Sequence, residues 1–314
     1  MEPKILVTSF NSWHMDHSAK LYDETNNLSG LYIGNKNARG ISKNLYRRCW
    51  SYHILMKPFY KFLSPLEWQQ VQFQLLMPIF NNWLLKQNFK EFNIVQSIAW
   101  GSKIPFDIAE KNGALKILDA PNSHPFLYYS LEKKEISAWG GNSKPSVPKK
   151  IIDQVVVDID RADLILCPSN WVRDSMVDNG VPESKCFINP FGVDTQIFNE
   201  RVSIPKNPTF VCTGSICLRK GHQYLFEAFK KVKEKYPTAK LICFGEVLSD
   251  FKHLWKKYKN IVLHYDFVTH DKLSQIYQNS SAFILPSIEE GFARSIIEAM
   301  ASGLPILTTY ESGA

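Results

Sequence analysis

The stretch SAFILPSIEEGFARSIIEAMASGLPILTTY, residues 281–310, contains an apolar run, an amphipathic segment and a second apolar run. Apolar residues at helical spacing between residues 291 and 301 predict a helix there. Its predicted buried stripe is Phe292, Ile296, Ile297 and Met300. A helix between two short apolar strands is the repeating unit of a parallel sheet that is covered on both faces. The stretch therefore predicts an α/β fold.

The same alternation of strands and helices runs through the rest of the chain in two blocks. The first block, residues 1–198, contains the strand-like runs KILVTSF, NIVQSIAW, ALKILDA and ADLILCPS. Residues 199–208, NERVSIPKNP, are polar, contain two prolines and lack periodicity, which is typical of a linker. The alternation resumes over residues 209–314 with TFVCTGS, AKLICFGE and NIVLHYDF. We expect two doubly wound domains that face a cleft and bind ligands at the carboxyl ends of their strands.

Composition indicates a globular enzyme with an acidic partner. The 314 residues are 45% hydrophobic and 21% charged, with a net charge of +7, which favours a nucleotide, a phospholipid head group or nucleic acid. No zinc knuckle or RNP-like pattern supports nucleic acid. The start of the chain shows no signal sequence, and the longest apolar run is too short to span a bilayer, so a cytoplasmic protein is expected. The six cysteines form no CxxC pair, so neither a metal site nor a disulfide framework is expected.

One basic and aromatic stretch, LYRRCWSYHILMKPFYKFLS at residues 45–64, has two interpretations. It fits a peripheral segment that rests on an anionic membrane, with its cations near the phosphates. These cations are Arg47, Arg48, Lys57 and Lys61. It equally fits a pair of helices with a mixed surface.

The turn TGSICLRKGH places two cations between a predicted strand and a predicted helix. Arg219 and Lys220 lie between Gly214 and Gly221, where backbone amides and positive charges can hold a diphosphate. The turn does not match the GxxxxGK[ST] pattern, and a Lys-Gly pair before a helix is also common in ordinary turns.

One acid, Glu290, directly precedes the predicted helix 291–301, and a second, Glu298, lies within it. Eight helical residues rise about 12 Å, so Glu290 and Glu298 could contact opposite ends of an elongated ligand that has hydroxyl groups at both ends. The alternative is an ordinary amphipathic helix. In that case Glu290 is favoured by the helix dipole, and Glu298 pairs with Arg294 one turn earlier.

Three stretches together resemble the GT-B glycosyltransferases of family 4. They are RADLILCPSNWVRDSMVDNGVPESKCFINPFGVDTQIF, GSICLRKGHQYLFEAF and PSIEEGFARSIIEAMASGLPIL, which cover most of the chain after residue 115. The resemblance implies a GT-B fold and a retaining transferase that uses a nucleotide-sugar donor, with no metal and no other cofactor. It also implies a glycan or lipid-linked acceptor in surface polysaccharide or lipid-linked glycan synthesis. Family members continue beyond the final ESGA, so the resemblance implies an incomplete second domain.

The resemblance also assigns roles to individual residues. Glu290 would contact the transferred sugar, Glu298 the ribose, and Lys220 the diphosphate. Ser215 stands where the family usually has an arginine, and Arg219 would replace that arginine. The remaining donor-binding candidates are Gly214 and the amides of Gly291, Phe292 and Ala293.

Two segments of the first block complete the candidate site. ILDAPNSHPF resembles the family's strand end that carries a histidine for the donor sugar, which would be His124 here, with Asp119 and Ser123 nearby. A capping or core histidine is the alternative. The segment FNSWHMDH stands in place of the family's glycine-rich turn. Its His14, Asp16 and His17 are candidates for acceptor or phosphate contact, or local structural residues.

The expected reaction is substitution on one face of the sugar, because no carboxylate in the first block is placed as a nucleophile for double displacement. Two other functions remain open. A sugar-nucleotide epimerase can share the architecture, and it would convert the donor without any acceptor. A catalytically silent nucleotide-sugar-binding subunit would bind the donor without turnover.

Overall fold

The computed structural model describes residues 2–11, 14–34, 40–55, 71–140, 143–200 and 204–313. It divides into two compact units. Unit 1 comprises Met1–Pro125, Ser146–Cys167 and Met176–Ile188, and unit 2 comprises Phe126–Pro145, Pro168–Ser175 and Asn189–Ala314. Unit 2 thus begins its long final stretch at residue 189, upstream of the predicted linker.

Unit 1 contains a parallel sheet of seven strands in the order β3-β2-β1-β4-β5-β6-β7. The strands are β1 Ile5–Ser9, β2 Leu28–Ile33, β3 Tyr46–Arg48, β4 Ile94–Ile98, β5 Leu115–Asp119, β6 Leu164–Cys167 and β7 Cys186–Ile188. The central strands are almost entirely buried, which explains why they appear in the sequence as continuous apolar runs. The neighbours of β1 are β2 on one side and β4 on the other, so the strand order reverses at β1.

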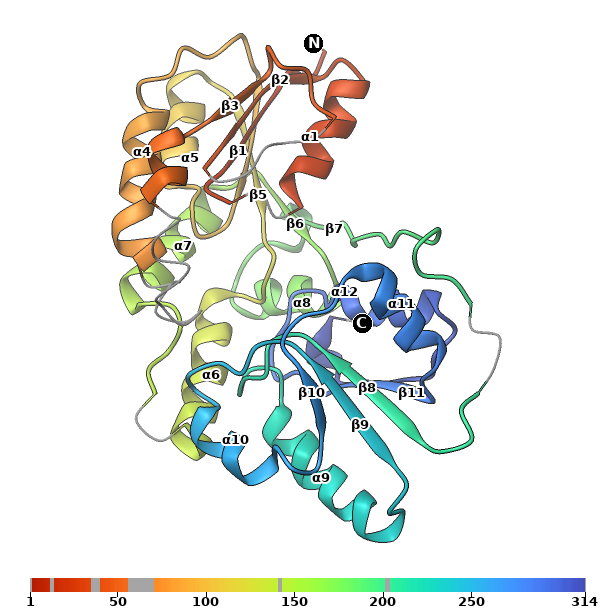
Figure 1. Cartoon of the computed structure of the whole chain (residues 1–314). Coiled ribbons are helices and arrows are strands. Elements are labelled where there is room, and N and C mark those ends of the chain that lie inside the picture. The colour runs from red at the N-terminus through yellow and green to blue at the C-terminus, as the bar shows by residue number, and fades with distance from the viewer. Residues whose placement is uncertain are drawn as a thin grey trace. The chain divides into compact units, whose positions relative to one another are not determined.

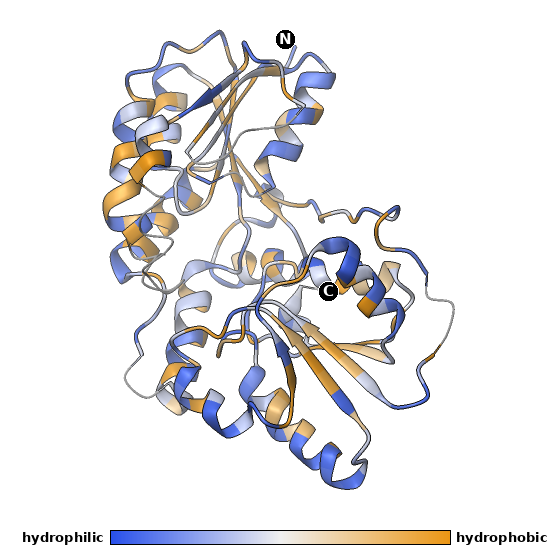
Figure 2. Cartoon of the chain, in the orientation of Figure 1, coloured by the Kyte–Doolittle hydropathy of each residue, from blue (hydrophilic) through white to orange (hydrophobic). Residues whose placement is uncertain are grey.

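Helices cover both faces of this sheet, as the alternation predicts. Figure 1 shows α1 (Met15–Glu24) on one face, and α4 (Met77–Leu84) and α5 (Lys103–Lys111) on the other. Further helical segments of this unit are η1 Gln72–Leu76, α7 Lys149–Arg161, η2 Glu183–Lys185, residues 50–55 and the end of α8 Asn170–Asp178, whose residues 170–175 belong to unit 2. Figure 2 shows that the helices of this unit carry both polar and apolar residues, as expected for helices that pack on a sheet with one face and meet water with the other.

Unit 2 repeats the architecture with five parallel strands in the order β10-β9-β8-β11-β12. The strands are β8 Thr209–Thr213, β9 Lys240–Phe244, β10 Leu263–Tyr265, β11 Ala282–Leu285 and β12 Ile306–Thr308. The helical segments are α6 Pro125–Trp139, α9 His222–Lys235, α10 Lys252–Tyr258, α11 His270–Gln278, α12 Arg294–Ala301 and η3 Tyr310–Ser312. Figure 1 shows α9 and α10 on one face of the sheet, and α11 and α12 on the other. The strand order reverses at β8, which lies between β9 and β11.

The stretch 45–64 combines the edge strand β3 at Tyr46–Arg48 with helical residues 50–55, and its residues 56–64 lie outside the described residues. The predicted pair of helices is therefore tested only in part. The predicted helix 291–301 begins only at Arg294, and Met300 is 58% exposed. Of the other predicted stripe residues, Ile296 is buried, and Phe292 and Ile297 are partly buried. Ala293 and Ala299 are also buried. All six cysteines are free, and five of them are buried.

Candidate functional site

The loop after β8 passes so close to its neighbours that two glycines are required. Gly221 has φ +70°, and a Cβ there would lie 1.9 Å from the carbonyl oxygen of Pro286, the residue that follows β11. Gly245, which follows β9, has φ +134°, and a Cβ there would lie 2.4 Å from the carbonyl oxygen of Gly214. Both conformations are strained for residues with side chains. The three strand ends therefore meet in one compact turn at the carboxyl edge of the sheet.

Hydrogen bonds join the loops after β8 and β11 directly. The Ile288 amide donates to the Arg219 carbonyl oxygen at 2.8 Å, and Arg219 Nη1 donates to the Glu289 carbonyl oxygen at 2.7 Å. These loops leave the sheet on the two sides of the point where the strand order reverses. Doubly wound sheets bind their ligands at this position.

Two cations and two carboxylates gather where these loops meet. Lys220 Nζ lies 2.5 Å from Glu290 Oε1, and Arg219 Nη1 lies 3.1 Å from the same oxygen. Arg219 Nη1 is also 3.3 Å from Oε2 of Glu289, whose side chain is only 1% exposed. The side chain of Lys220 is 15% exposed, so this cation is largely withdrawn from water. The predicted cations and Glu290 thus form one cluster, to which the structure adds Glu289.

The cluster fixes the charge of Glu290. Burial alone would raise the pKa of this carboxyl, but the charges of Arg219 and Lys220 outweigh burial and lower it to about 2. The two carboxylates in turn raise the pKa of Arg219 against the effect of burial. Glu290 and Arg219 are therefore both charged at neutral pH.

Asp250 holds the loop that carries Arg219 and Lys220 in place. It was not among the residues predicted from the sequence. Its Oδ2 accepts a hydrogen bond from the Leu218 amide at 3.0 Å, and its side chain is buried. Burial raises the pKa of Asp250, while the Leu218 amide opposes that shift. The only sequence signal is its place shortly after β9. Glu289 was missed although it adjoins Glu290, because nothing in the sequence shows which of two neighbouring acids turns inward.

Glu298 lies in α12, whereas Glu290 lies in the loop before it, so the rise of about 12 Å along one continuous helix does not describe their separation. Glu298 is half-buried, and burial raises its pKa against the charges of Arg294 and His270. Within the described ranges, Glu298 forms no ion pair, including none with Arg294. The simple alternative of a surface pair along the helix is therefore not what these residues form.

The amides before α12 are used differently from the prediction. The Ala293 amide donates to the Ser312 carbonyl oxygen at 3.1 Å, and the Glu290 amide donates to Glu311. These bonds to η3 explain why the helix starts late. In the described part of the chain, the amides of Gly291 and Phe292 have no hydrogen-bond partner. Only these two of the three predicted amides are available to a ligand without rearrangement, while Ser215 follows Gly214 in the loop and is half-buried.

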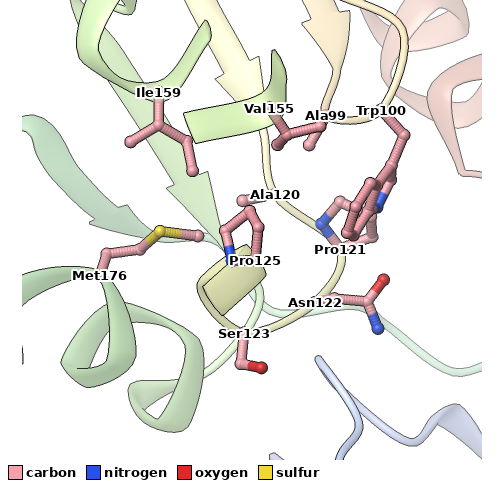
Figure 3. A pocket seen from close by; sticks show the side chains of 10 residues that line it. All are labelled: Ala99, Trp100, Ala120, Pro121, Asn122, Ser123, Pro125, Val155, Ile159 and Met176. Atoms are coloured by element: carbon pink, nitrogen blue, oxygen red, sulfur yellow. The ribbon is translucent and has the colours of Figure 1, made fainter. Parts of the chain in front are cut away.

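Unit 1 holds the remaining candidates. His124 is 2% exposed, and burial lowers its pKa to about 4 against the charge of Asp160, so its imidazole is neutral at pH 7. Such burial favours the interpretation as a core histidine. Ser123 and Asn122 line a pocket of about 10 Å³ beside Trp100, and Figure 3 shows it enclosed mainly by apolar side chains. This volume is enough for about one water molecule, so the pocket is too small for a sugar.

Comparison with known proteins agrees with this geometry. Residues 193–314 match the family model of glycosyl transferases group 1. The chain is 26% identical over 166 residues to sulfoquinovosyl transferase SQD2 of Arabidopsis thaliana, covering 48% of this chain and 31% of that protein. It is 31% identical over 135 residues to the capsular polysaccharide biosynthesis glycosyltransferase CapM of Staphylococcus aureus, covering 40% of this chain and 34% of that protein. The chain thus spans about a third of the length of these relatives.

Solved structures match nearly the whole chain. Sucrose-phosphate synthase from Thermosynechococcus elongatus superposes with a TM-score of 0.63 at 13% identity, covering 97% of this chain and 81% of that one. Alr3699/HepE from Anabaena, solved with UDP-glucose, superposes with a TM-score of 0.62 at 13% identity, covering 98% and 81%. These likenesses establish the fold. The chain therefore has the GT-B fold, and its residues 193–314 are similar to the glycosyl transferases group 1 family.

Proposed function

We propose that the protein is a retaining glycosyltransferase that moves a sugar from a nucleotide-diphosphate donor to a hydroxyl group of an acceptor. The observation that carries the proposal is the convergence of Arg219 and Lys220 on Glu290 at the point where the strand order of unit 2 reverses. Two cations that are mostly shielded from water at this position suit a diphosphate better than a single phosphate or a neutral ligand.

Donor binding then proceeds as an exchange of anions. Glu290 pairs with Arg219 and Lys220 in the structure, so an incoming diphosphate competes with this carboxylate for both cations. Glu289 remains on Arg219, because its side chain is buried and bonded there. Once displaced, Glu290 can accept hydrogen bonds from the hydroxyl groups of the donor sugar. The exchange keeps the buried cations neutralised before and after binding, which avoids the cost of isolated buried charges.

The other candidate residues of unit 2 make the remaining contacts with the donor. Glu298 accepts hydrogen bonds from the ribose hydroxyls. The amides of Gly291 and Phe292 contact the sugar and the phosphates. Relatives support a nucleotide sugar as donor, since Alr3699/HepE was solved with UDP-glucose. They also support a glycan acceptor, since the name of CapM refers to capsular polysaccharide biosynthesis.

The chemistry is mainly electrostatic. The bond between the anomeric carbon and the phosphate oxygen breaks, and its electron pair leaves with the diphosphate. The acceptor oxygen bonds to the same face of the sugar, and its proton passes to the departing phosphate oxygen. Lys220 and Arg219 stabilise the negative charge that develops on that oxygen. Each such contact is worth about 3 kcal/mol of transition-state stabilisation.

An anionic membrane surface is the proposed location of this reaction, on the cytoplasmic side. Arg47 is exposed, Trp50 is 60% exposed and Ile54 is 62% exposed. The Arg48 guanidinium carbon lies 3.4 Å from the centre of the Trp50 ring. Cations beside exposed apolar side chains suit the interface of an anionic bilayer. Lys57 and Lys61 lie outside the described residues. None of the helices in the described residues has both the length and the apolar composition needed to cross a bilayer.

A thermal-shift panel tests the donor assignment. The protein is heated with UDP, GDP, ADP and their glucose, mannose and N-acetylglucosamine conjugates. We expect one nucleotide series to raise the melting temperature, because a ligand that binds only the folded state stabilises it. The same donor is then incubated without acceptor, and the products are separated. A new nucleotide sugar would identify an epimerase instead, and an unshifted melting temperature with every nucleotide would contradict the proposal.

A further inference from the structure

A serine hydroxyl group joins two segments of unit 2 that lie far apart in the sequence. Ser169 follows β6 by two residues and directly precedes α8, and Gly291 lies in the loop between β11 and α12. Both residues belong to unit 2. The Ser169 hydroxyl group donates a hydrogen bond to the Gly291 carbonyl oxygen at 2.6 Å, and Ser169 is buried. This bond therefore links the start of α8 to the residue that follows Glu290.

The hydroxyl group of Ser169 is used both as a donor and as an acceptor. Its oxygen accepts a hydrogen bond from the Val172 amide at 3.3 Å, which is the pattern of a serine that caps the N-terminus of a helix. A serine hydroxyl group has one proton and two lone pairs. The Gly291 carbonyl group can only accept, so the hydroxyl proton is committed to it. Ser169 thus caps α8 and holds Gly291 at the same time.

The Gly291 carbonyl group is confined from a second side as well. Gly313 has φ +74°, and a Cβ there would lie 2.3 Å from the Gly291 carbonyl oxygen. The backbone at position 313 can approach this oxygen closely only because glycine has no side chain. Ser169 and Gly313 together therefore fix the direction in which the Gly291 carbonyl bond points.

The direction of this carbonyl group determines the direction of the next amide. In a planar trans peptide unit, the Gly291 carbonyl oxygen and the Phe292 amide hydrogen lie in one plane and point in opposite directions. Among the residues that the structure describes, none accepts a hydrogen bond from the Phe292 amide. The structure thus holds an available N–H group in a fixed direction. It lies two residues after Glu290, whose carboxylate pairs with Lys220.

An amide that is held in this way is ready to bind an oxygen atom of the donor. Donor groups that are already oriented contribute most to a reaction, because they need not reorient as charge develops in the transition state. Glycine tolerates more backbone conformations than other residues, so the peptide unit after Gly291 could otherwise rotate. The hydrogen bond from Ser169 opposes this rotation.

We infer that Ser169 is a positioning residue of the donor site. Its hydroxyl group holds the peptide unit between Gly291 and Phe292 so that the Phe292 amide donates a hydrogen bond to an oxygen atom of the bound donor. Ser169 acts through Gly291, because its own proton is committed to that carbonyl group. The inference rests on the proposed glycosyl transfer. The competing explanation is that Ser169 serves only as the cap of α8.

Substitutions at position 169 separate the two roles. Ser169→Ala removes both the helix cap and the bond to Gly291. Glycine is an acceptable capping residue, so Ser169→Gly retains most of the capping stability but still lacks that bond. Ser169→Thr keeps the hydroxyl group and can form both bonds. Ser175→Ala is the matched control, because Ser175 is a buried residue of α8 whose hydroxyl group donates to the Val172 carbonyl oxygen of the same helix.

The experiment measures kcat/KM for release of nucleotide from the donor that shifts the melting temperature. Melting curves are recorded for every variant, and rates are taken well below all melting temperatures. We expect Ser169→Ala and Ser169→Gly to lower kcat/KM by the same factor, about tenfold, which corresponds to one lost hydrogen bond. Ser169→Gly should nevertheless melt closer to wild type than Ser169→Ala does. Ser169→Thr and Ser175→Ala should release nucleotide at nearly the rate of wild type.

Three results would overturn the inference. Rates that followed the melting temperatures, with Ser169→Gly close to wild type, would make Ser169 a helix cap only. A loss in Ser169→Thr as large as that in Ser169→Gly would show that the hydroxyl group is not responsible. A loss in Ser175→Ala as large as that in Ser169→Gly would assign the effect to α8 as a whole. If Ser169→Ala fails to fold, the comparison of Ser169→Gly with Ser169→Thr decides alone. A wild type that binds or consumes no nucleotide sugar would instead overturn the proposed function, and this inference with it.

Discussion

The two units use the same edge of the same kind of sheet for different chemistry. In unit 2, the loops beside β8 bring together Arg219, Lys220 and two glutamates. In unit 1, the same edge brings together His14 and Asp119, and the backbone of Trp100 has a positive φ there. The topology determines where a ligand can bind in both units, because strand order reverses at β1 and at β8. The loop residues determine which ligand is suited to each edge, and the two cations of unit 2 suit an anion.

Removal of a cation should have the largest effect. Lys220→Ala should lower transfer about 100- to 1,000-fold, because one donor to the developing phosphate charge is lost. The donor-induced thermal shift should also disappear. Lys230→Ala removes the same charge from an exposed position on α9 and should leave both unchanged. If the two variants behaved alike, net charge rather than a built anion site would explain binding. Steady-state transfer rates and melting curves provide the measurements.

An added methyl group should destabilise the protein more in the tight turn at Gly221 of unit 2 than at Gly113 of unit 1. Gly221→Ala combines φ +70° with a Cβ placed 1.9 Å from the Pro286 carbonyl oxygen, and should cost about 3 kcal/mol. Gly113→Ala in unit 1 has a similar φ of +63° but no atom within 4 Å, and should cost about 1 kcal/mol. Urea unfolding measures both. Equal costs would mean that the loops after β8 and β11 separate easily, against the compact turn described above.

Two buried carboxyls should give the units opposite responses to pH. Burial raises the pKa of Asp158 in α7 to about 6, against its bonds to Ser102 and the charge of Arg161. A raised carboxyl pKa stabilises the fold at low pH, and this contribution is lost as pH rises from about 4 through 6. The lowered pKa of Glu290 has the reverse sign: its contribution is present above about 4.5 and lost as pH falls towards 2.

The substitution Asp158→Asn should therefore reduce the change in the free energy of unfolding between pH 4 and 7 by about 2 kcal/mol. Asp153→Asn, an exposed position on the same helix, should leave the slope unchanged. Urea midpoints at half-unit steps of pH measure the slope. A slope that persisted in Asp158→Asn would assign it to another group.

The sequence predicts most of the fold because buried parallel strands are continuous apolar runs. It fails where that signal is interrupted. Strand β2, LSGLYI, is fully buried, but Ser29 and Gly30 break its apolar run. Strand β3 is a basic edge strand of three residues, which offers no apolar run to recognise. The start of α12 depends on amide bonds to η3, which lies far enough along the chain that helical periodicity gives no sign of it.

In the candidate site too, only the residues that have a local signal in the sequence could be predicted. Arg219, Lys220 and Glu290 could be predicted because glycines and a strand end mark their loops. Their mutual pairing could not, since it depends on two loops from strands that are neighbours only in the folded sheet. Asp250 was missed for the same reason, and Glu289 was missed because the sequence does not show which of two neighbouring acids turns inward. His14 was one of three candidates in its segment, and only the approach of β5 distinguishes it from Asp16 and His17.

The exchange of Glu290 for a diphosphate is tested most directly by the thermal shift that a free nucleoside diphosphate produces in two variants. Glu290→Gln removes the competing anion, so the shift should exceed that of wild type. Lys220→Ala removes the partner of the diphosphate, so the shift should vanish. Opposite changes would support an anion site at which Glu290 and the donor compete for the same cations. Shifts that matched wild type in both variants would contradict it.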